Sequence, residues 1–513
     1  MTFDRLLKPL FFLLFVITIV QYWFFSPVVF ADASRGFEAM EQYMAGGNWN
    51  SVSYPVVGGD YQYFLSWWTP GQWVFPFLLI KIGVGMNTAL QLITTVALSV
   101  SIFGYYRLFR ILDFSSVLVW GSLITIVTNQ LFYWHTIMYY GGDLLLLALF
   151  PYFVLFLLKL RKSVSLLNLC LLFVYILIGF FLKSSFLVIS WAGVGSFILI
   201  WLLQGDKRNR KWTLYLIPLL TATVVIYIFF LAKGETPGST IRSGAYNHLT
   251  HDIFGDLFYA LGSPVGIMTR FFPAIQKVIA NVGVNLNFLA ILGCIASGWL
   301  LVRFFTSGSE DRKQVILFSG LFFAAMTFLF LSDRAVSYDM RHFAPFAFLL
   351  TPFMLEWCIS VRWKKLFLSV LIVLNLADFA LFPIYGYKVE HTHEMVGEIK
   401  MKQEDAEIVR RIYSGQTENN RLVIIQDYWL LSHYMREPSI CLSEQNGDWI
   451  VNSGMEEIHK EKMDWDILSS YHTVIFVSRN SGELPVELQK RVQKERGEIS
   501  NGYTIFLLTP IKD

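Results

Sequence analysis

Long apolar runs recur along most of this 513-residue chain, and they constrain its fold more than any other feature. A helix needs about 20 mostly apolar residues to cross a bilayer, and helical spans satisfy every backbone hydrogen bond internally. Runs of this kind predict about eleven membrane-spanning helices. They lie near residues 10–30, 87–110, 116–138, 144–160, 166–182, 186–204, 213–232, 285–305, 314–331, 343–360 and 366–387.

The composition agrees with a membrane protein. Hydrophobic residues make up 55% of the chain and charged residues 15%, where a soluble domain has about 25% charged residues. The net charge of +3 is spread over short loops, so no nucleic-acid partner is expected. Arg5 and Lys8 precede the first apolar run, and no small-residue cleavage site closes it. We therefore predict a retained first helix.

The loop charges predict the orientation, because Lys and Arg concentrate in cytoplasmic loops. With the N-terminus in the cytoplasm, every short inner loop is basic. These loops carry Arg107, Arg110, Lys159, Arg161, Lys162, Lys207, Arg208, Arg210, Lys211, Arg303, Arg312, Lys313, Arg362, Lys364 and Lys365. Three larger segments then lie outside, at about 31–86, about 233–284 and after about 388.

The chain divides into two predicted domains at residue 387. Residues 1–387 form an all-α polytopic module, and a short run at 71–84, interrupted by Pro76, is interpreted as a re-entrant or interfacial helix. Residues 388–513 have an ordinary soluble composition and predict a small extracytoplasmic α/β domain. Its strand-like runs are 421–426, 473–477 and 503–508, and its helical stretches are around 400–413, 454–470 and 484–496.

Basic residues on the outer side run against the orientation rule and are candidates for binding an anion. Arginine and lysine suit a phosphate headgroup, since both form charge-assisted hydrogen bonds. Ordinary loop charge or snorkelling to lipid phosphates is the alternative. The group consists of Arg35, Lys183, Lys233, Arg242, Arg270, Lys277, Arg334 and Arg341.

Lys183 is the strongest of these candidates. It lies between two apolar runs with Ser184 and Ser185 as its polar neighbours, and an ammonium at membrane depth is costly and usually paired. Arg334 and Arg341 flank a short turn before a late helix. Local pairing with the aspartates of that turn is the alternative to a functional role.

Two outer aspartates are candidates for acid–base chemistry. Asp32 begins an amphipathic stretch, and Asp143 lies in a tight turn before the fourth span. Aspartate is also a favoured helix N-cap, so capping is an alternative for both. Asp60, Trp68 and Tyr140 lie among aromatic residues and are candidates for a substrate pocket.

Several short motifs together resemble the membrane glycosyltransferases of the GT-C fold, particularly the bacterial branch related to lipid A aminoarabinose transferase and protein O-mannosyltransferases. The resemblance covers roughly residues 1–385. In chain order, the motifs are Asp32-x-x-Arg35, Gly47-Asn48-Trp49, Trp67-Trp68-Thr69-Pro70, Asp143, Lys183, and Arg341-His342-x-x-Pro345.

The resemblance implies transfer of a sugar from a polyprenyl-phosphate donor to an acceptor at the outer face, with inversion. Asp32 would be the general base and Asp143 would orient or assist. The phosphate would bind Arg35, Lys183 and Arg341, with Arg334 and His342 as further candidates. No cofactor is implied, and fixed cations make a divalent metal unnecessary, although the acids leave one open.

The expected partners are membrane lipids, the lipid-linked sugar and an acceptor that is a lipid, a glycan or a protein. We expect a bacterial inner membrane with the C-terminal domain in the periplasm; the endoplasmic reticulum is the alternative. A flippase or transporter of a lipid-linked glycan and a non-catalytic membrane scaffold are the competing functions. A transporter needs a polar path, but polar residues within the spans are sparse, with Asn375 and Asp378 as the main exceptions.

Overall fold

The computed structural model describes most of the chain and divides it into two compact units. Apart from short internal gaps, the described residues are 3–233, 298–331, 340–360, 375–396, 399–413, 421–426, 439–445, 448–451, 462–478, 484–500 and 503–511. The helical unit comprises Met1–Pro27, Leu90–Ile228 and Ile241–Tyr387. The sheet unit comprises Val28–Ala89, Phe229–Thr240 and Lys388–Asp513.

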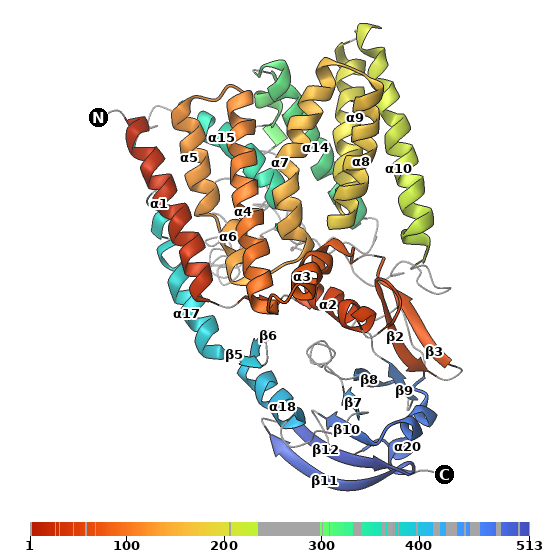
Figure 1. Cartoon of the computed structure of the whole chain (residues 1–513). Coiled ribbons are helices and arrows are strands. Elements are labelled where there is room, and N and C mark those ends of the chain that lie inside the picture. The colour runs from red at the N-terminus through yellow and green to blue at the C-terminus, as the bar shows by residue number, and fades with distance from the viewer. Residues whose placement is uncertain are drawn as a thin grey trace, which may run out of the picture. The chain divides into compact units, whose positions relative to one another are not determined.

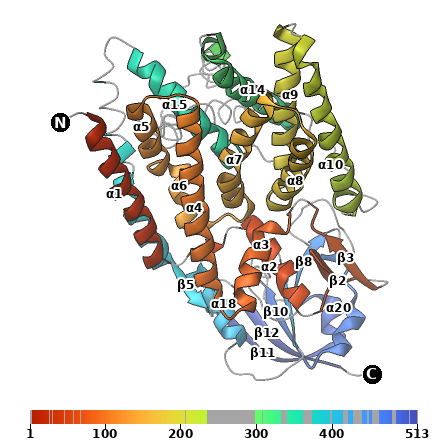
Figure 2. The same cartoon turned by 45° about the horizontal axis from the view of Figure 1, so that its top comes forward.

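The helical unit is built from helices that lie side by side (Figures 1 and 2). Within it, α14 packs along α9, and α5 packs against both α1 and α15. The helices are α1 (Phe3–Phe24), α4 (Met86–Ile111), α5 (Ser116–Val127), α6 (Gln130–Tyr133), α7 (Gly142–Lys162), α8 (Leu166–Leu182), α9 (Phe186–Gln204), α10 (Leu216–Phe229), α14 (Glu310–Leu331) and α15 (Ala344–Ser360), followed by α17 (Phe382–Thr392).

Five helices in the described residues are long and apolar enough to cross a membrane, and a bent pair raises that number to six. The chain is therefore a multi-pass membrane protein, while the predicted number of eleven spans stays a prediction. The run expected at 116–138 is not one straight helix, because α5 and the segment Gln130–Thr136 meet at 57°. Asn129 causes the break: its side chain accepts a hydrogen bond from Leu131 N at 2.8 Å and begins a new helix.

Arg312 joins three helices at the basic end of the helical unit. Its guanidinium donates to the carbonyls of Leu112 at 2.9 Å and Asp113 at 3.0 Å, just beyond the end of α4. It also donates to Glu356 Oε2 of α15 at 3.0 Å and lies 4.1 Å from the ring centre of Phe114. A cation at a helix C-terminus donates hydrogen bonds to the last carbonyls, which have no partner within the helix, and interacts favourably with the negative end of the helix dipole.

The sheet unit contains a six-stranded mixed sheet with the order β11-β12-β10-β7-β8-β9. Strands β10, β7 and β8 run parallel, and the flanking strands are antiparallel to their neighbours. The three strands predicted at 421–426, 473–477 and 503–508 are confirmed. The strand bounds are β7 (Arg421–Gln426), β8 (Ser439–Gln445), β9 (Asp448–Val451), β10 (Thr473–Ser478), β11 (Val492–Ser500) and β12 (Tyr503–Pro510).

The helical stretches predicted for the tail were partly wrong. The stretch at 400–413 is confirmed as α18 (Gln403–Tyr413), but 484–496 holds only the short α20 (Val486–Gln489) before β11 begins. The charged sequence of β11 belongs to an edge strand, where lysine and arginine discourage pairing with other chains. In the stretch 454–470, the described residues form the 3₁₀ helix η6 (Trp465–Ser470), and 454–461 lies outside them.

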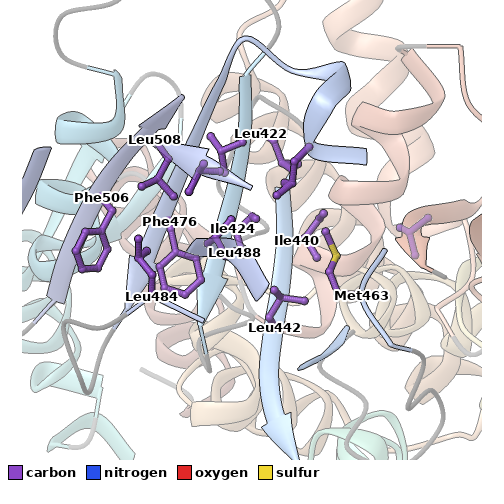
Figure 3. Close-up of a cluster of buried hydrophobic side chains, with 14 of the residues drawn as sticks. Leu422, Ile424, Ile440, Leu442, Met463, Phe476, Leu484, Leu488, Phe506 and Leu508 are labelled. Atoms are coloured by element: carbon purple, nitrogen blue, oxygen red, sulfur yellow. The ribbon is translucent and has the colours of Figure 1, made fainter. Parts of the chain in front are cut away.

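Both faces of this sheet are covered by apolar side chains. On one face, residues of α18 pack against Val423, Ile425 and Ile475. On the other face, the tail residues labelled in Figure 3 form a larger cluster. Three members of that cluster come from the first outer segment, namely Ala39, Val52 and Leu65. The outer segment and the C-terminal tail therefore share one hydrophobic core.

The first outer segment contains α2 (Ala31–Met44), the hairpin β2 (Ser51–Val56) and β3 (Gly59–Phe64), and α3 (Gly71–Lys81). Asn50 connects them, because its side chain donates to Leu65 O at 2.8 Å and accepts from Trp73 Nε1 at 2.9 Å. A helix is confirmed within the run expected at 71–84, over Gly71–Lys81. Its exposed side carries the apolar Phe75 and Leu78, and its re-entrant or interfacial placement stays a prediction.

Arg312→Ala should lower the melting temperature of the detergent-solubilised protein by several degrees. The change leaves two carbonyls and a carboxylate without their shared donor, which costs about 2 kcal/mol or more. Arg110→Ala, at an exposed position near the end of α4, is the matched control and should change the melting temperature little. Equal melting temperatures for the two variants would contradict the role given to Arg312.

Candidate functional site

A buried aspartate at the beginning of α7 is the centre of the candidate site. Gly141 adopts φ 57°, a left-handed conformation that favours glycine, and caps the helix. Asp143 follows in the first turn, where the helix dipole stabilises a negative charge. At 21 residues, α7 is about 30 Å long, so this site and the basic residues at Lys159–Lys162 are separated by roughly the thickness of a bilayer core.

Lys183 reaches this carboxylate from the end of α8. Its Nζ lies 3.1 Å from each oxygen of Asp143, forming a hydrogen-bonded ion pair. Gly142 makes this close approach possible: a Cβ built on it would lie 2.5 Å from Leu182 O and 3.0 Å from Lys183 Cδ. The short connection between α8 and α9 thus brings Lys183 to Asp143.

Arg341 and His342 come from η5 (Met340–Phe343), the turn that precedes α15. Arg341 Nε lies 3.7 Å from Asp143 Oδ2, and His342 Nδ1 lies 3.9 Å from Asp143 Oδ1. The contacts therefore bring together, around one carboxylate, residues that are up to 199 positions apart in the sequence.

Aromatic packing fixes the segment that carries Arg341 and His342. Phe343 stacks on Phe323 of α14 at 5.2 Å, and Phe346 stacks on Phe322 at 3.9 Å. From α4, the Tyr105 hydroxyl donates to the carbonyl of Pro345 at 2.8 Å. Stacked rings and a buried hydrogen bond restrict this turn, so its basic side chains are held in place.

Basic groups outnumber acidic ones among the described side chains of the site. The Asp143 side chain is only 2% exposed, and it faces two basic side chains, Lys183 and Arg341. Burial lowers the pKa of His342 to about 3, and the charge of Lys183 acts in the same direction. His342 is therefore uncharged at neutral pH, and among the residues that the structure describes here, two cations face one carboxylate. Such a site can bind an anion and has its cations pre-oriented.

The structure joins some of the predicted site residues and leaves others untested. Asp143, Lys183, Arg341 and His342 converge, and the Tyr140 ring centre lies 6.0 Å from Arg341 Cζ. The prediction that each of them binds or acts on a substrate stays a prediction.

The remaining predicted residues belong mostly to the sheet unit. Asp32 and Arg35 fall in α2 and Asp60 falls in β3, but their side chains lie outside the described residues, as does Arg334 entirely. Trp68 packs against the hydrophobic core of the sheet unit, and its place in a substrate pocket stays a prediction.

His135 was missed from the sequence. It lies in η1 (Trp134–Thr136), is 5% exposed, and its ring centre is 5.3 Å from that of Tyr140. The available signal was a histidine at the outer end of a predicted span, where ionisable residues are uncommon.

The described part of the chain holds no group of three or more His, Cys, Asp or Glu side chains arranged to bind a metal ion. The carboxylate of Asp143 instead faces the nitrogen atoms of Lys183, Arg341 and His342.

Solved structures similar to this chain have one fold in common. The crystal structure of ArnT from Cupriavidus metallidurans in the apo state is 12% identical, with a TM-score of 0.61, over 98% of each chain. The same protein bound to undecaprenyl phosphate is 11% identical, with a TM-score of 0.59, over 98% of this chain and 97% of that one. No family model and no curated protein matches the sequence. ArnT is a lipid A aminoarabinose transferase, so the resemblance predicted from the motifs is confirmed for the fold.

Gly142→Ala should destabilise the protein by about 2 kcal/mol, because the new Cβ would overlap the carbonyl of Leu182 and push the end of α8 away. The melting temperature should fall by several degrees. Gly121→Ala is a matched control in a buried helix, where the Cβ would meet only Leu355 at an ordinary 3.7 Å. If both glycine variants melt at the wild-type temperature, α7 and α8 do not need this close approach.

Proposed function

We propose that this protein is a membrane glycosyltransferase that uses a polyprenyl-phosphate-linked sugar as its donor. The observation that carries the proposal is the pair of cations, Lys183 and Arg341, held around buried Asp143 at the outer end of α7. A site with excess positive charge suits a phosphate, and arginine can form two parallel hydrogen bonds to its oxygens. The likeness to ArnT bound to undecaprenyl phosphate supports the choice of a lipid phosphate.

The proposed reaction is an inverting displacement at the anomeric carbon. An acceptor hydroxyl forms a new carbon–oxygen bond, and the bond between the sugar and the phosphate breaks. The acceptor's proton passes to a general base, for which we propose Asp32. The bonding electrons leave with the lipid phosphate, whose growing negative charge Lys183 and Arg341 stabilise.

Asp143 serves in this proposal to orient the cations. Its carboxylate is buried, which disfavours the charged form, but the ion pair with Lys183 and the nearby Arg341 offset that cost. Because the carboxylate already holds the lysine and arginine side chains in place, ordering them costs little further conformational entropy when the phosphate binds. Arg35 and Arg334 remain proposed phosphate ligands, and His342 would contribute hydrogen bonding without charge.

The reaction proposed here needs no divalent metal, because protein cations occupy the role that a metal ion has in many phosphate sites. The acceptor is a lipid, a glycan or a protein. We further propose a bacterial inner membrane, with the N-terminus in the cytoplasm and the sheet unit in the periplasm. The basic residues at the Lys162 end of α7 support that orientation, since such ends face the cytoplasm.

Lys183→Ala should weaken binding of undecaprenyl phosphate by about tenfold or more, which corresponds to loss of one charge-assisted contact. Binding is measured on the purified full-length protein in nanodiscs by native mass spectrometry or calorimetry. Lys159→Ala removes an exposed lysine from the opposite end of α7 and should bind like the wild type. Unchanged affinity in Lys183→Ala would return this lysine to a purely structural role.

Asp32→Asn should reduce sugar transfer at least about 100-fold and keep binding of undecaprenyl phosphate, because the change removes a base and little shape. Transfer of radiolabelled sugar from undecaprenyl-phosphate sugars to a membrane extract is measured with and without EDTA, which should have little effect. Glu487→Gln is an exposed control with the same chemical change. Full transfer by Asp32→Asn would refute the mechanism, and flipping of the donor without transfer would indicate a transporter.

A further inference from the structure

Three polar atoms beside the ion cluster have no hydrogen-bond partner among the described residues. They are His135 Nδ1, His342 Nδ1 and Ser185 Oγ, all buried. Leaving a buried donor or acceptor unpaired is unfavourable, because it loses its hydrogen bonds to water and gains none in the protein. Such atoms at a charged site are candidates for binding a polar ligand.

The three atoms come from the same segments that supply the cluster. His135 lies in the segment that leads to Asp143, Ser185 follows Lys183 by two residues, and His342 follows Arg341. The ring of Tyr140 connects His135 to the cations, since it is 5.3 Å from the imidazole and 6.0 Å from the guanidinium carbon. His135 is 5% exposed and His342 is 8% exposed, so bulk water does not satisfy them.

Their chemistry differs from that of the cations. Lys183 and Arg341 only donate hydrogen bonds and carry charge, which suits phosphate oxygens. A serine hydroxyl both donates and accepts, and a neutral imidazole has one donor nitrogen and one acceptor nitrogen. Sugar hydroxyls also donate and accept, so uncharged groups of this kind complement them. An aromatic ring such as Tyr140 adds an apolar surface for the face of the sugar.

Geometry limits where the sugar can lie. In a polyprenyl-phosphate donor the anomeric carbon is joined to a phosphate oxygen, so a phosphate held by Lys183 and Arg341 places the sugar within a few bond lengths of them. Uncharged polar groups near the cations, such as His342 beside Asp143 and His135 beside Tyr140, are thus candidates to contact the sugar ring.

We propose that His135, with Ser185 and His342, binds the hydroxyl groups of the donor sugar and selects that sugar. The proposal rests on the proposed function, because it assumes that Lys183 and Arg341 hold the phosphate of the same molecule. His135 is its most informative member, since its Nδ1 is unpaired and its ring packs on Tyr140.

The test compares lipids with and without a sugar. Undecaprenyl phosphate and undecaprenyl phosphoryl mannose, glucose and 4-amino-4-deoxyarabinose are titrated into the full-length protein in nanodiscs. Wild-type protein should bind one sugar-bearing lipid at least about tenfold more tightly than undecaprenyl phosphate. His135→Phe, which keeps a ring against Tyr140, should lose most of that difference while its affinity for undecaprenyl phosphate changes less than about twofold.

Two conservative variants identify the nitrogen that matters. The amide of asparagine takes roughly the place of Nδ1, and that of glutamine the place of Nε2. His135→Asn should therefore recover part of the preference for the sugar-bearing lipid, and His135→Gln should not. The melting temperature of each variant shows whether it is folded, and the comparison requires that the asparagine and glutamine variants both fold.

The outcomes distinguish failure of the sugar site from failure of the proposed glycosyltransferase function. No binding of any lipid to the wild type overturns the proposed function itself. Tight binding of undecaprenyl phosphate with no preference for a sugar, or the same loss for both kinds of lipid in His135→Phe, overturns the sugar site alone. An equal recovery by asparagine and glutamine also overturns the role of Nδ1.

Discussion

The ion pair between Asp143 and Lys183 is the interaction on which the candidate site depends. A buried carboxylate is strongly unfavourable unless it is paired with cations. Burying Asp143 therefore requires that the end of α8 and the turn before α15 meet the beginning of α7. The glycines before Asp143 and the aromatic stacks under η5 are the means by which the fold meets that requirement. Charge burial in this protein therefore positions the helices as well as the ligand-binding groups.

The opposite end of the helical unit uses charge differently. Arg312 lies where the predicted cytoplasmic loops are, and it bonds to backbone carbonyls and to one exposed glutamate. The charge of Arg312 is balanced by that of Glu356. At the other end, two described basic side chains, Lys183 and Arg341, share the single carboxylate of Asp143. Both ends hold buried or half-buried arginine, and the contrast gives a physical reason to look for an anionic ligand at the Asp143 end.

Lys183 and Arg341 could be named from one sequence because the orientation rule marks basic residues on the predicted outer side as exceptions, and both belong to that group of eight. The central strands were predictable from continuous β-branched runs, such as 421–426. The strand β11 was not, because its charges have helical propensity and only the neighbouring strand β12 determines its state. His135 was missed for a related reason: its ring contact with Tyr140, five residues later, depends on the local fold of the segment between them and follows neither helical nor strand periodicity.

The shared core of the sheet unit has a consequence for biosynthesis. Residues Ala39, Val52 and Leu65 emerge early from the ribosome, but the strands that cover them are made last, beyond residue 420. Contacts so distant in sequence form slowly, and exposed apolar surface invites aggregation in the interval. The segment that contains Asp32 therefore obtains its final support only after every intervening helix has been inserted. A chain truncated before residue 420 would therefore lack the strands that cover Ala39, Val52 and Leu65.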